Sequence, residues 1–279
     1  MKLSCLPVSF FPEILEGRLS VEAWARMGAG LRLDAIDLSI LFLPDRSKGA
    51  VAAMRKGIEA AGTRVAMVTT YPDFTHPDAA QRERELLLAE QTVAVAAGLG
   101  AELLRVTAGQ SHPGTGREQG IRWAVEGLRR LAERAHGSGV RLVYENHSKP
   151  GAWTYTDFSE PPEIFLAILR GTADAGLGVN FDTANATAFS PDPVALLEAC
   201  LDRVVCIHAA DTAVRGALKP VLLGTGLAPF APIFRRLIRA GWDGWICIEE
   251  ASCQGQEGVA RAAAFVRRLW GECRQEAGG

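Results

Sequence analysis

The 279-residue sequence has no excess of charge of either sign, because 30 lysines and arginines balance 32 acidic residues and leave a net charge of −2. Proteins held on nucleic acid or on an anionic membrane carry a basic surface that this balance does not indicate. Long hydrophobic runs are also missing: the longest, near residues 92–99, is far shorter than the ~20 residues of a membrane helix. We therefore expect a small-molecule partner, with no nucleic acid and no membrane involved.

The sequence also lacks Cys-x-x-Cys pairs and the features expected of a secretory signal. None of the six cysteines forms a Cys-x-x-Cys pair, and most lie in apolar runs, where a reduced thiol acts as a small hydrophobic group. The N-terminal segment has one early basic residue, followed by Pro7 and Glu13, and this is not typical of a secretory signal. These features predict a cytoplasmic protein without structural disulfides or a zinc cluster.

A repeated unit organises most of the chain. In each unit a helical pattern ends near a glycine, and a short β-rich apolar run follows and closes on a polar residue. Five clear units pair helices at 82–97, 118–135, 162–169, 193–200 and 229–240 with strands at 103–107, 140–145, 177–182, 204–208 and 245–249. Weaker units add strands at 3–8, 35–40 and 64–69, the last two after helices that start near Ser20 and Gly49.

Eight strands that alternate with helices, without a linker, predict one parallel sheet in a single domain covering residues 1–279. Eight units suggest closure into a (β/α)8 TIM barrel, an α/β fold whose usual length is roughly 250 residues. An open doubly wound sheet is the alternative. No Gly-x-Gly-x-x-Gly follows the first strand, and the turn at Gly224 and Gly226 lacks the lysine of a P-loop, so neither nucleotide motif is supported.

Four successive strands end in side chains that can bind a metal ion. These side chains, about one unit apart, are Glu145, Asp182, His208 and Glu249. The C-terminal strand ends of a barrel face the mouth, where ligands bind. Three carboxylates and an imidazole suit one divalent ion such as Mn²⁺, Mg²⁺ or Co²⁺, with Zn²⁺ as an alternative. Each carboxylate alone is compatible with a helix N-cap or a loop charge, and the histidine with a core position. Three carboxylates buried close together, however, require a cation or protons to compensate their charge.

Four segments carry a resemblance to a known family. They lie at 144–147 (Tyr-Glu-Asn-His), 180–185 (Asn-Phe-Asp-Thr-Ala-Asn), 207–211 (Ile-His-Ala-Ala-Asp) and 241–249. Together they resemble the xylose isomerase-like TIM barrel superfamily of sugar and sugar-phosphate isomerases and epimerases. The resemblance implies one divalent ion held by the four strand-end residues and a carbohydrate substrate. It also implies that Glu145 and Glu249 exchange protons with the substrate from opposite faces, through an enediolate.

Some positions depart from the pattern of that family. Asn185 stands where many members have a histidine that binds substrate oxygens, and Ala210 stands where a lysine is frequent. Strand two has Asp37 as its nearest carboxylate instead of a glutamate. Glu250 beside Glu249 leaves a one-residue ambiguity, and we favour Glu249 because strand residues alternate between faces.

Further residues are weaker candidates. His147, Asn185, Arg215 and His112 are candidates for substrate binding, each with a structural role as the alternative, and Lys149 and Trp153 lie on a long loop that could cover the mouth. A homo-oligomer is compatible with the sequence, since tryptophans such as Trp242, Trp245 and Trp270 could form an interface, although core packing explains them equally well.

The sequence therefore predicts a metal-dependent isomerase or epimerase of a sugar, sugar phosphate or polyol ketone. A metal-dependent dehydratase of a cyclic polyol or sugar acid is the first alternative, because expulsion of a β-hydroxyl can follow the same proton abstraction. A non-catalytic sugar-binding barrel is the second. Repair of abasic DNA, another activity of this fold, is disfavoured because that branch resembles a histidine-rich three-metal site and the chain has five histidines.

Overall fold

Eight parallel strands form the centre of the molecule in the computed structural model, which describes residues 1–149 and 151–278. They are β1 (Lys2–Leu6), β2 (Ile36–Ser39), β3 (Val65–Thr69), β4 (Leu103–Val106), β5 (Arg141–Glu145), β6 (Gly178–Asp182), β7 (Val204–Ala209) and β8 (Trp245–Glu249). Each strand from β2 to β8 pairs with its sequence neighbour, and β8 pairs with β1, so the strands form a nearly closed barrel. The fold is the expected single (β/α)8 barrel.

The junction between β1 and β2 differs from the other seven. There the backbone N–H of Asp34 donates to the carbonyl of Leu3 at 2.8 Å, and the Asp34 carboxylate accepts from the Leu3 N–H at 2.8 Å. Inside the barrel, the Ser4 hydroxyl donates to the carboxylate of Asp37 at 2.7 Å. The side chains of Asp34, just before β2, and of Asp37, within β2, therefore join β1 to β2.

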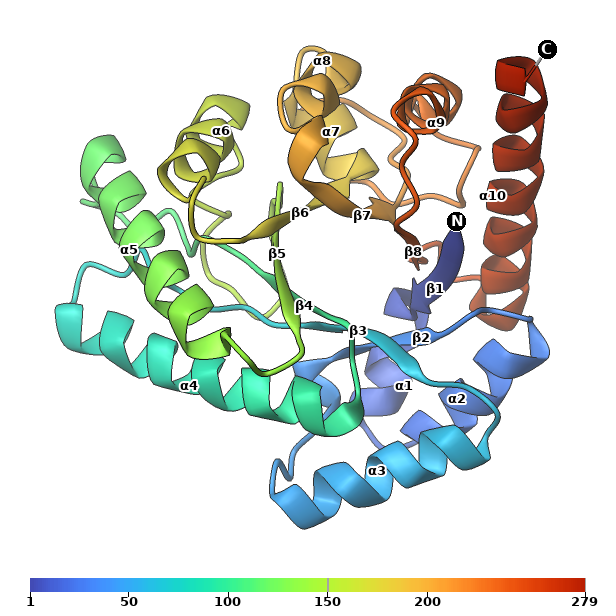
Figure 1. Ribbon diagram of the computed structural model, residues 1–279, viewed down its shortest axis with the longest axis horizontal. Coiled ribbons are helices and arrows are strands. Elements are labelled where there is room, and N and C mark those ends of the chain that lie inside the picture. The colour runs from blue at the N-terminus through green and yellow to red at the C-terminus, as the bar shows by residue number, and fades with distance from the viewer. Residues whose placement is uncertain (150, 279) are drawn as a thin grey trace.

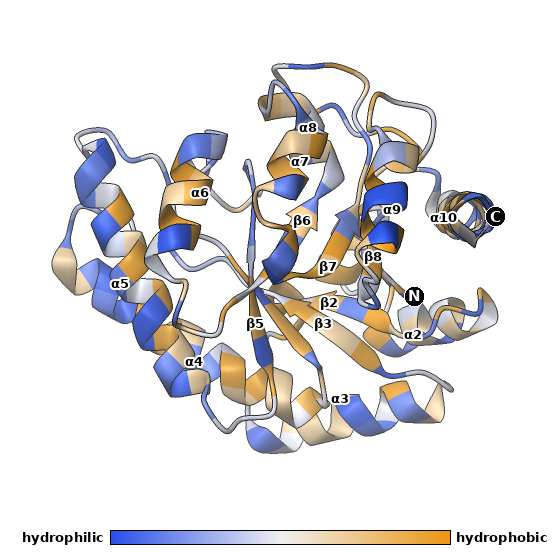
Figure 2. Ribbon diagram, turned by 45° about the horizontal axis from the view of Figure 1, so that its top comes forward, coloured by the Kyte–Doolittle hydropathy of each residue, from blue (hydrophilic) through white to orange (hydrophobic). Residues whose placement is uncertain are grey.

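Helices cover the outside of the barrel (Figure 1). They are α1 (Phe11–Leu15), α2 (Val21–Gly30), α3 (Lys48–Ala60), α4 (Ala79–Leu99), α5 (Arg117–Ala135), α6 (Pro162–Gly171), α7 (Thr183–Phe189), α8 (Pro193–Glu198), α9 (Phe230–Arg239) and α10 (Gly255–Gly278), with short 3₁₀ helices at Val8–Phe10, Ile40–Phe42 and Leu201–Arg203. Figure 2 shows mainly hydrophobic strands at the centre and helices that mix hydrophobic and hydrophilic residues. No helix of the described residues is long and apolar enough to cross a membrane.

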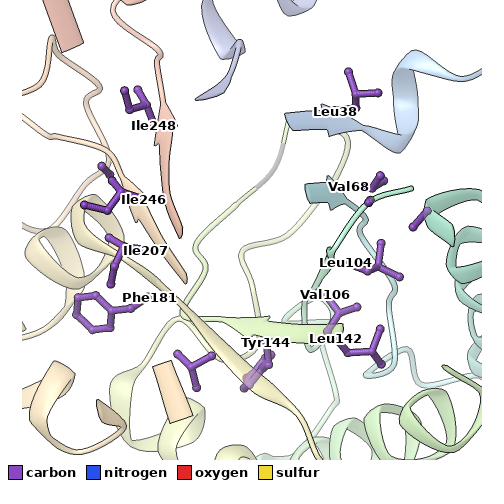
Figure 3. Packing of buried hydrophobic residues seen from close by; sticks show 14 of the residues in the cluster. Leu38, Val68, Leu104, Val106, Leu142, Tyr144, Phe181, Ile207, Ile246 and Ile248 are labelled. Carbon is purple, nitrogen blue, oxygen red and sulfur yellow. The ribbon is translucent and has the colours of Figure 1, made fainter. Parts of the chain in front are cut away.

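Strand residues alternate between two environments. Figure 3 shows outward-facing side chains such as Ile246, Ile248 and Phe181, which pack in the layer between strands and helices. Their neighbours along the strands, among them Cys247 and Glu249, therefore face the barrel axis. A separate apolar cluster inside the barrel, nearer the N-terminal ends of the strands, includes Cys206, Trp245 and Cys247. This alternation brings the polar ends of the strands to the mouth.

A group of charged residues surrounds Trp245 at the N-terminal end of the barrel. The carboxylate of Glu102 accepts hydrogen bonds from Arg64 at 2.5 Å, from the Trp245 indole at 2.8 Å and from Lys2 at 3.2 Å. Both cations also lie over the indole ring, at 4.7 Å for Lys2 and 5.2 Å for Arg64. Partial burial alone would raise the pKa of Glu102, but the hydrogen bonds from its three partners outweigh it and lower the pKa to about 2.

Glu102→Gln is expected to remove an acid-sensitive part of the stability. A pKa lowered on folding means that the unfolded chain takes up the proton first, so Glu102 contributes stability above pH 4.5 and loses it as the pH falls towards 2. The free energy of unfolding, measured by urea titration from pH 7 to pH 2, should differ between variant and wild type at the upper end and converge at the lower. A difference that stays constant over this range would contradict the assignment.

The tryptophans considered for an interface lie mostly in the core. Trp245 is 2% exposed and Trp270 is 6% exposed, while half-buried Trp242 donates to the carbonyl of Val204 at 2.9 Å. Their packing inside the molecule explains them, so these residues give no support to an oligomer.

Candidate active site

A cavity of about 300 Å³ opens at the C-terminal end of the strands, where the sequence predicts the site. Of the predicted site residues, Asp182, Glu249, His147 and Asn185 line it. The cavity floor also contains the side chain of Arg105, and the loop after β5 contributes Lys149 to its rim. The cavity therefore lies directly above the ends of β4, β6 and β8.

Three of the four predicted ligands form a compact buried cluster. Ligand atoms of Glu145, Asp182 and His208 all lie within 4.8 Å of one another, and each residue is at most 1% exposed. The register of β6 and β7 places Asp182 directly opposite His208. His208 Nδ1 lies 2.6 Å from Glu145 Oε1, which also accepts from the Asn180 amide at 2.9 Å. Residues 63 positions apart in sequence thus share one hydrogen bond.

Burial and mutual electrostatic interactions shift the pKa values of all three residues of this cluster. Burial alone would lower the pKa of His208, but the carboxylates of Glu145, Glu249 and Asp182 outweigh it and raise the pKa to about 10. Burial would raise the pKa of Glu145, yet the charges of His208 and Arg105 lower it to about 2. Burial and the neighbouring carboxylates raise the pKa of Asp182 well above its ordinary value. The strand ends therefore favour an added positive charge, whether a proton or a metal ion.

A divalent metal ion fits the atoms that remain without partners. Asp182 Oδ2 and His208 Nε2 are buried and make no hydrogen bond within the described part of the chain. Buried polar atoms of this kind are rare unless a ligand, ion or water satisfies them. The donor set of two carboxylates and one imidazole, with Glu249 on the adjacent wall of the cavity, suits a hard or borderline cation.

The sequence reasoning missed Arg105. Its guanidinium is 1% exposed, with Nε 3.0 Å from Glu145 Oε2, Nη1 donating to the Thr70 carbonyl at 3.0 Å, and its face 4.7 Å from the Tyr71 ring. The sequence contains an indication of its role, because this arginine interrupts the apolar run Leu103–Val106. A charged side chain buried in a strand requires a partner of opposite charge. Arg105 fixes the orientation of Glu145 from the side opposite His208.

Arg105→Leu is expected to destabilise the metal-free protein by about 3–5 kcal/mol, because it leaves Glu145 buried without one of its two charged partners. Urea unfolding in the presence of a chelator measures this loss. Arg235→Leu is the control, because Arg235 forms an exposed ion pair with Glu276 and its removal should change the stability little. Equal stability of the two variants would contradict the role of Arg105.

The structure separates Glu249 from Glu250. Glu249 lines the cavity, whereas Glu250 is fully buried outside the cavity lining, where its Oε1 accepts from the Ser252 N–H at 2.8 Å. The preference for Glu249 as the site residue agrees with this geometry. Its carboxylate lies outside the compact three-residue cluster, and its side chain is half-buried whereas those of the cluster are buried, so it is the most exposed member of the predicted set.

His147 and Asn185 occupy positions from which they can reach a ligand. His147 Nδ1 lies 3.5 Å from the buried carboxylate of Asp157. The N–H of Asn185 donates to Asp182 Oδ1 at 2.5 Å. The buried Oδ1 of Asn185 has no hydrogen-bond partner among the described residues. It can therefore accept a hydrogen bond from a substrate hydroxyl.

His112 and Arg215 are not among the residues that line the cavity. His112 Nε2 lies 2.7 Å from the carboxylate of Asp73, and the ring packs edge-on against Tyr155. Arg215 is exposed and donates to the carbonyls of Thr187 and Ser190 at the end of α7. These contacts stabilise loops, and the geometry gives no support for substrate binding by either side chain.

Asp37 also lies outside the cavity lining. It is fully buried inside the barrel, where its carboxylate accepts from Ser4 and from the Met67 N–H at 3.1 Å. Burial is the main cause of its pKa of about 6. The carboxylate of strand two thus joins strands below the site and does not replace a glutamate at the mouth.

The chain belongs to the xylose isomerase-like TIM barrel family, whose model matches residues 21–269. An inosose dehydratase of Lacticaseibacillus casei is 25% identical over 139 residues, 44% of each chain. A putative hydroxypyruvate isomerase of Streptomyces coelicolor is 27% identical over 217 residues, 74% of this chain and 76% of that one. The chain spans about half the length of the inosose dehydratase that it matches.

Solved structures agree with the fold. A D-tagatose 3-epimerase-like protein superposes with a TM-score of 0.81 at 17% identity, and the match covers 100% of both chains. At this identity the likeness concerns the barrel architecture alone.

Proposed function

We propose that the protein is a divalent-metal-dependent isomerase or epimerase that acts on a sugar or a polyol ketone. The observation that carries the proposal is the buried cluster of Glu145, Asp182 and His208, which has unpartnered ligand atoms and lies beside a cavity walled by Glu249. A relative named putative hydroxypyruvate isomerase supports the same class of chemistry. A binding barrel without catalysis would not require a third carboxylate, that of Glu249, next to such a cluster.

In this proposal Glu145 and Glu249 have two roles, and the other residues have one. Glu145, Asp182, His208 and Glu249 would hold one ion, Mn²⁺, Mg²⁺, Co²⁺ or Zn²⁺. A bound ion supplies Lewis-acid polarisation of a carbonyl, which acidifies the adjacent carbon. Glu249 would take or return the proton of that carbon from the cavity wall, with Glu145 as its partner on the other face. His147 and Asn185 would orient substrate oxygens by hydrogen bonds.

Dehydration of a cyclic polyol or sugar acid is the second candidate, favoured by the relatives named inosose dehydratase. Both reactions begin when a carboxylate removes a proton next to a carbonyl, so the same side chains would serve either. They differ in the second step, since return of the proton gives an isomer or epimer, whereas loss of a β-hydroxyl gives an unsaturated product.

The test combines metal analysis with proton exchange. The purified protein is analysed for metal content, and deuterium uptake from D₂O is measured with a panel of ketoses and cyclic polyol ketones. We expect about one divalent ion per chain and deuterium uptake that a chelator abolishes. Ultraviolet absorbance of an unsaturated product would assign the dehydratase reaction. Absence of exchange in metal-saturated protein would leave a sugar-binding barrel and contradict the proposal.

A further inference from the structure

The loop between β5 and α6 contains a buried carboxylate next to a histidine of the cavity. His147 lines the cavity, and its Nδ1 lies 3.5 Å from the fully buried carboxylate of Asp157. Asp157 Oδ1 accepts from the N–H and from the hydroxyl of Ser159, both at 2.7 Å. Asp157 Oδ2 and His147 Nδ1 are buried too, and neither has a hydrogen-bond partner among the described residues. Because a buried carboxylate oxygen requires a donor, these two atoms are suited to each other.

The ring of His147 has a second contact in the same loop. Trp153 is buried and packs edge-on against it, with ring centroids 6.1 Å apart. In a neutral histidine, the hydrogen bond of one ring nitrogen decides which nitrogen carries the proton. A proton held on Nδ1 by Asp157 leaves Nε2 as a hydrogen-bond acceptor, whereas a neutral histidine in water carries its proton mainly on Nε2.

The loop after β4 holds the segment that contains Asp157. Gln110 forms an antiparallel bridge with Asp157, and the Phe158 N–H donates to the carbonyl of Gly109 at 2.8 Å. The close approach requires a glycine, because Gly109 has a φ of 128° and a Cβ there would collide with Thr75. The backbone around Asp157 is therefore fixed by a different loop of the barrel.

The side chain of Gln110 also binds the loop after β5. Its Oε1 accepts from the N–H groups of Thr154 at 2.9 Å and Tyr155 at 3.1 Å. Its Nε2 donates to Asp73 Oδ2 at 2.9 Å, and the same oxygen lies 2.7 Å from His112 Nε2. An amide donates only through its nitrogen, so the Asp73 carboxylate determines which end of Gln110 faces the loop after β5.

We propose that Asp157 and Gln110 are positioning residues for His147. Gln110 fixes the segment 154–158, Asp157 accepts the Nδ1 proton of His147, and Nε2 is left as the acceptor for a substrate hydroxyl. Neither Asp157 nor Gln110 lines the cavity, so both act through the histidine ring. The inference rests on the proposed function, in which His147 orients a substrate oxygen.

The position of the His147 proton tests the inference without a substrate. NMR spectra of the ring nitrogens in the metal-free protein distinguish a neutral ring with its proton on Nδ1 from one with its proton on Nε2. We expect the proton on Nδ1 in the wild type and a mixture of the two forms in Gln110→Ala. Exposed His136 is the internal control and should have the same spectrum in every variant. A wild-type His147 with its proton on Nε2 overturns the inference.

Asp157→Asn should reverse the position of the proton while it keeps the size of the side chain. The oxygen of the new amide should remain with the two donors of Ser159, so its nitrogen would face His147 Nδ1 and donate to it. The ring must then carry its proton on Nε2, the effect known for the same change behind a catalytic histidine. A proton that stays on Nδ1 in this variant contradicts the role of Asp157.

Kinetics tests whether the two residues act through His147. With a substrate that exchanges deuterium, Asp157→Asn should raise KM by about 10-fold, the loss of one hydrogen bond, with kcat nearly unchanged. In a His147→Ala background, Asp157→Asn and Gln110→Ala should each change KM by less than about twofold. Ser20→Ala is the control for lost stability, because it removes the N-cap of α2 and should leave KM unchanged. Effects that multiply with that of His147→Ala overturn the inference.

The NMR measurement separates this inference from the proposed function. If no compound exchanges deuterium in metal-saturated protein, the proposed function fails, and the His147 spectra still decide on the contact with Asp157. A proton on Nδ1 in the wild type that moves to Nε2 in Asp157→Asn supports the positioning of the ring without catalysis. The same tautomer in both proteins overturns it.

Discussion

Glu249→Gln is expected to lower kcat by roughly 10²–10⁴-fold, the usual effect of losing a general acid or base. Glutamine keeps the size and the hydrogen-bonding oxygen of Glu249 but cannot take a proton at neutral pH. Because this carboxylate lines the cavity and is also a candidate ligand, turnover is measured at saturating metal, with the metal content of the variant determined alongside.

The adjacent residue provides the control for this variant. Glu250→Gln removes a carboxylate one position away whose side chain lies outside the cavity lining, where Oε1 accepts from Ser252. Its amide oxygen can keep that hydrogen bond, so kcat should remain close to that of the wild type. Full activity of Glu249→Gln would contradict a role of Glu249 as acid or base. A large loss of kcat in Glu250→Gln, with little loss in Glu249→Gln, would assign the role to Glu250 instead.

Asp182→Asn is expected to weaken metal binding without destabilising the metal-free protein. In the metal-free protein the variant should unfold at the same temperature or a higher one, because it removes a buried carboxylate that lies beside those of Glu145 and Glu249. Asparagine still caps α7, since its side-chain oxygen can accept from the Asn185 N–H as that of Asp182 does. The backbone of the site should therefore remain intact.

In the presence of metal, the wild type should instead unfold at a higher temperature than the Asp182→Asn variant. Loss of a ligand should weaken metal affinity by at least about 100-fold, because changes to residues that only orient ligands already cost 10–100-fold. Wild type should gain about 2.7 kcal/mol at a metal concentration 100 times its Kd, whereas the variant at the same concentration should gain little. Thermal unfolding with and without MnCl₂ measures both effects. An equal metal-induced rise in Tm for the two proteins would remove Asp182 from the ligand set.

Most of the strands were predictable because they follow a helix and a glycine; the strand at 3–8 begins the chain, and the strand at 204–208 follows its helix without a glycine. The strand at 245–249 matches β8 in full, and the other predicted strands differ from the observed ones by one or two residues at their ends. Helix α7 was not predicted, because all of its residues except Phe189 are buried and no amphipathic period exists to be read. Its N-cap is Asp182, so the residue that was interpreted as a ligand also begins the helix.

The site was predictable where the strand ends carry the chemistry themselves. Glu145, Asp182 and His208 follow apolar runs at the same height, and closing the barrel brings them together. Arg105 and Asn180 could not be assigned in this way, because their role lies in contacts with Glu145 that depend on the register of neighbouring strands. Arg215 and His112 were selected by loop position, and loop conformation directs both side chains to other partners.

The junction between β1 and β2 divides the barrel into parts of unequal stiffness. The strands that carry the candidate ligands, β5 to β8, are joined to one another by backbone ladders, with one irregularity between β6 and β7, whereas β1 and β2 are joined through the backbone and side chain of Asp34 and through the contact between Ser4 and Asp37. A ladder resists separation of its strands more than a few side-chain contacts do. We therefore expect the barrel to open more easily between β1 and β2 than among the strands that carry the candidate ligands, with Phe11, which follows β1, on the more compliant side.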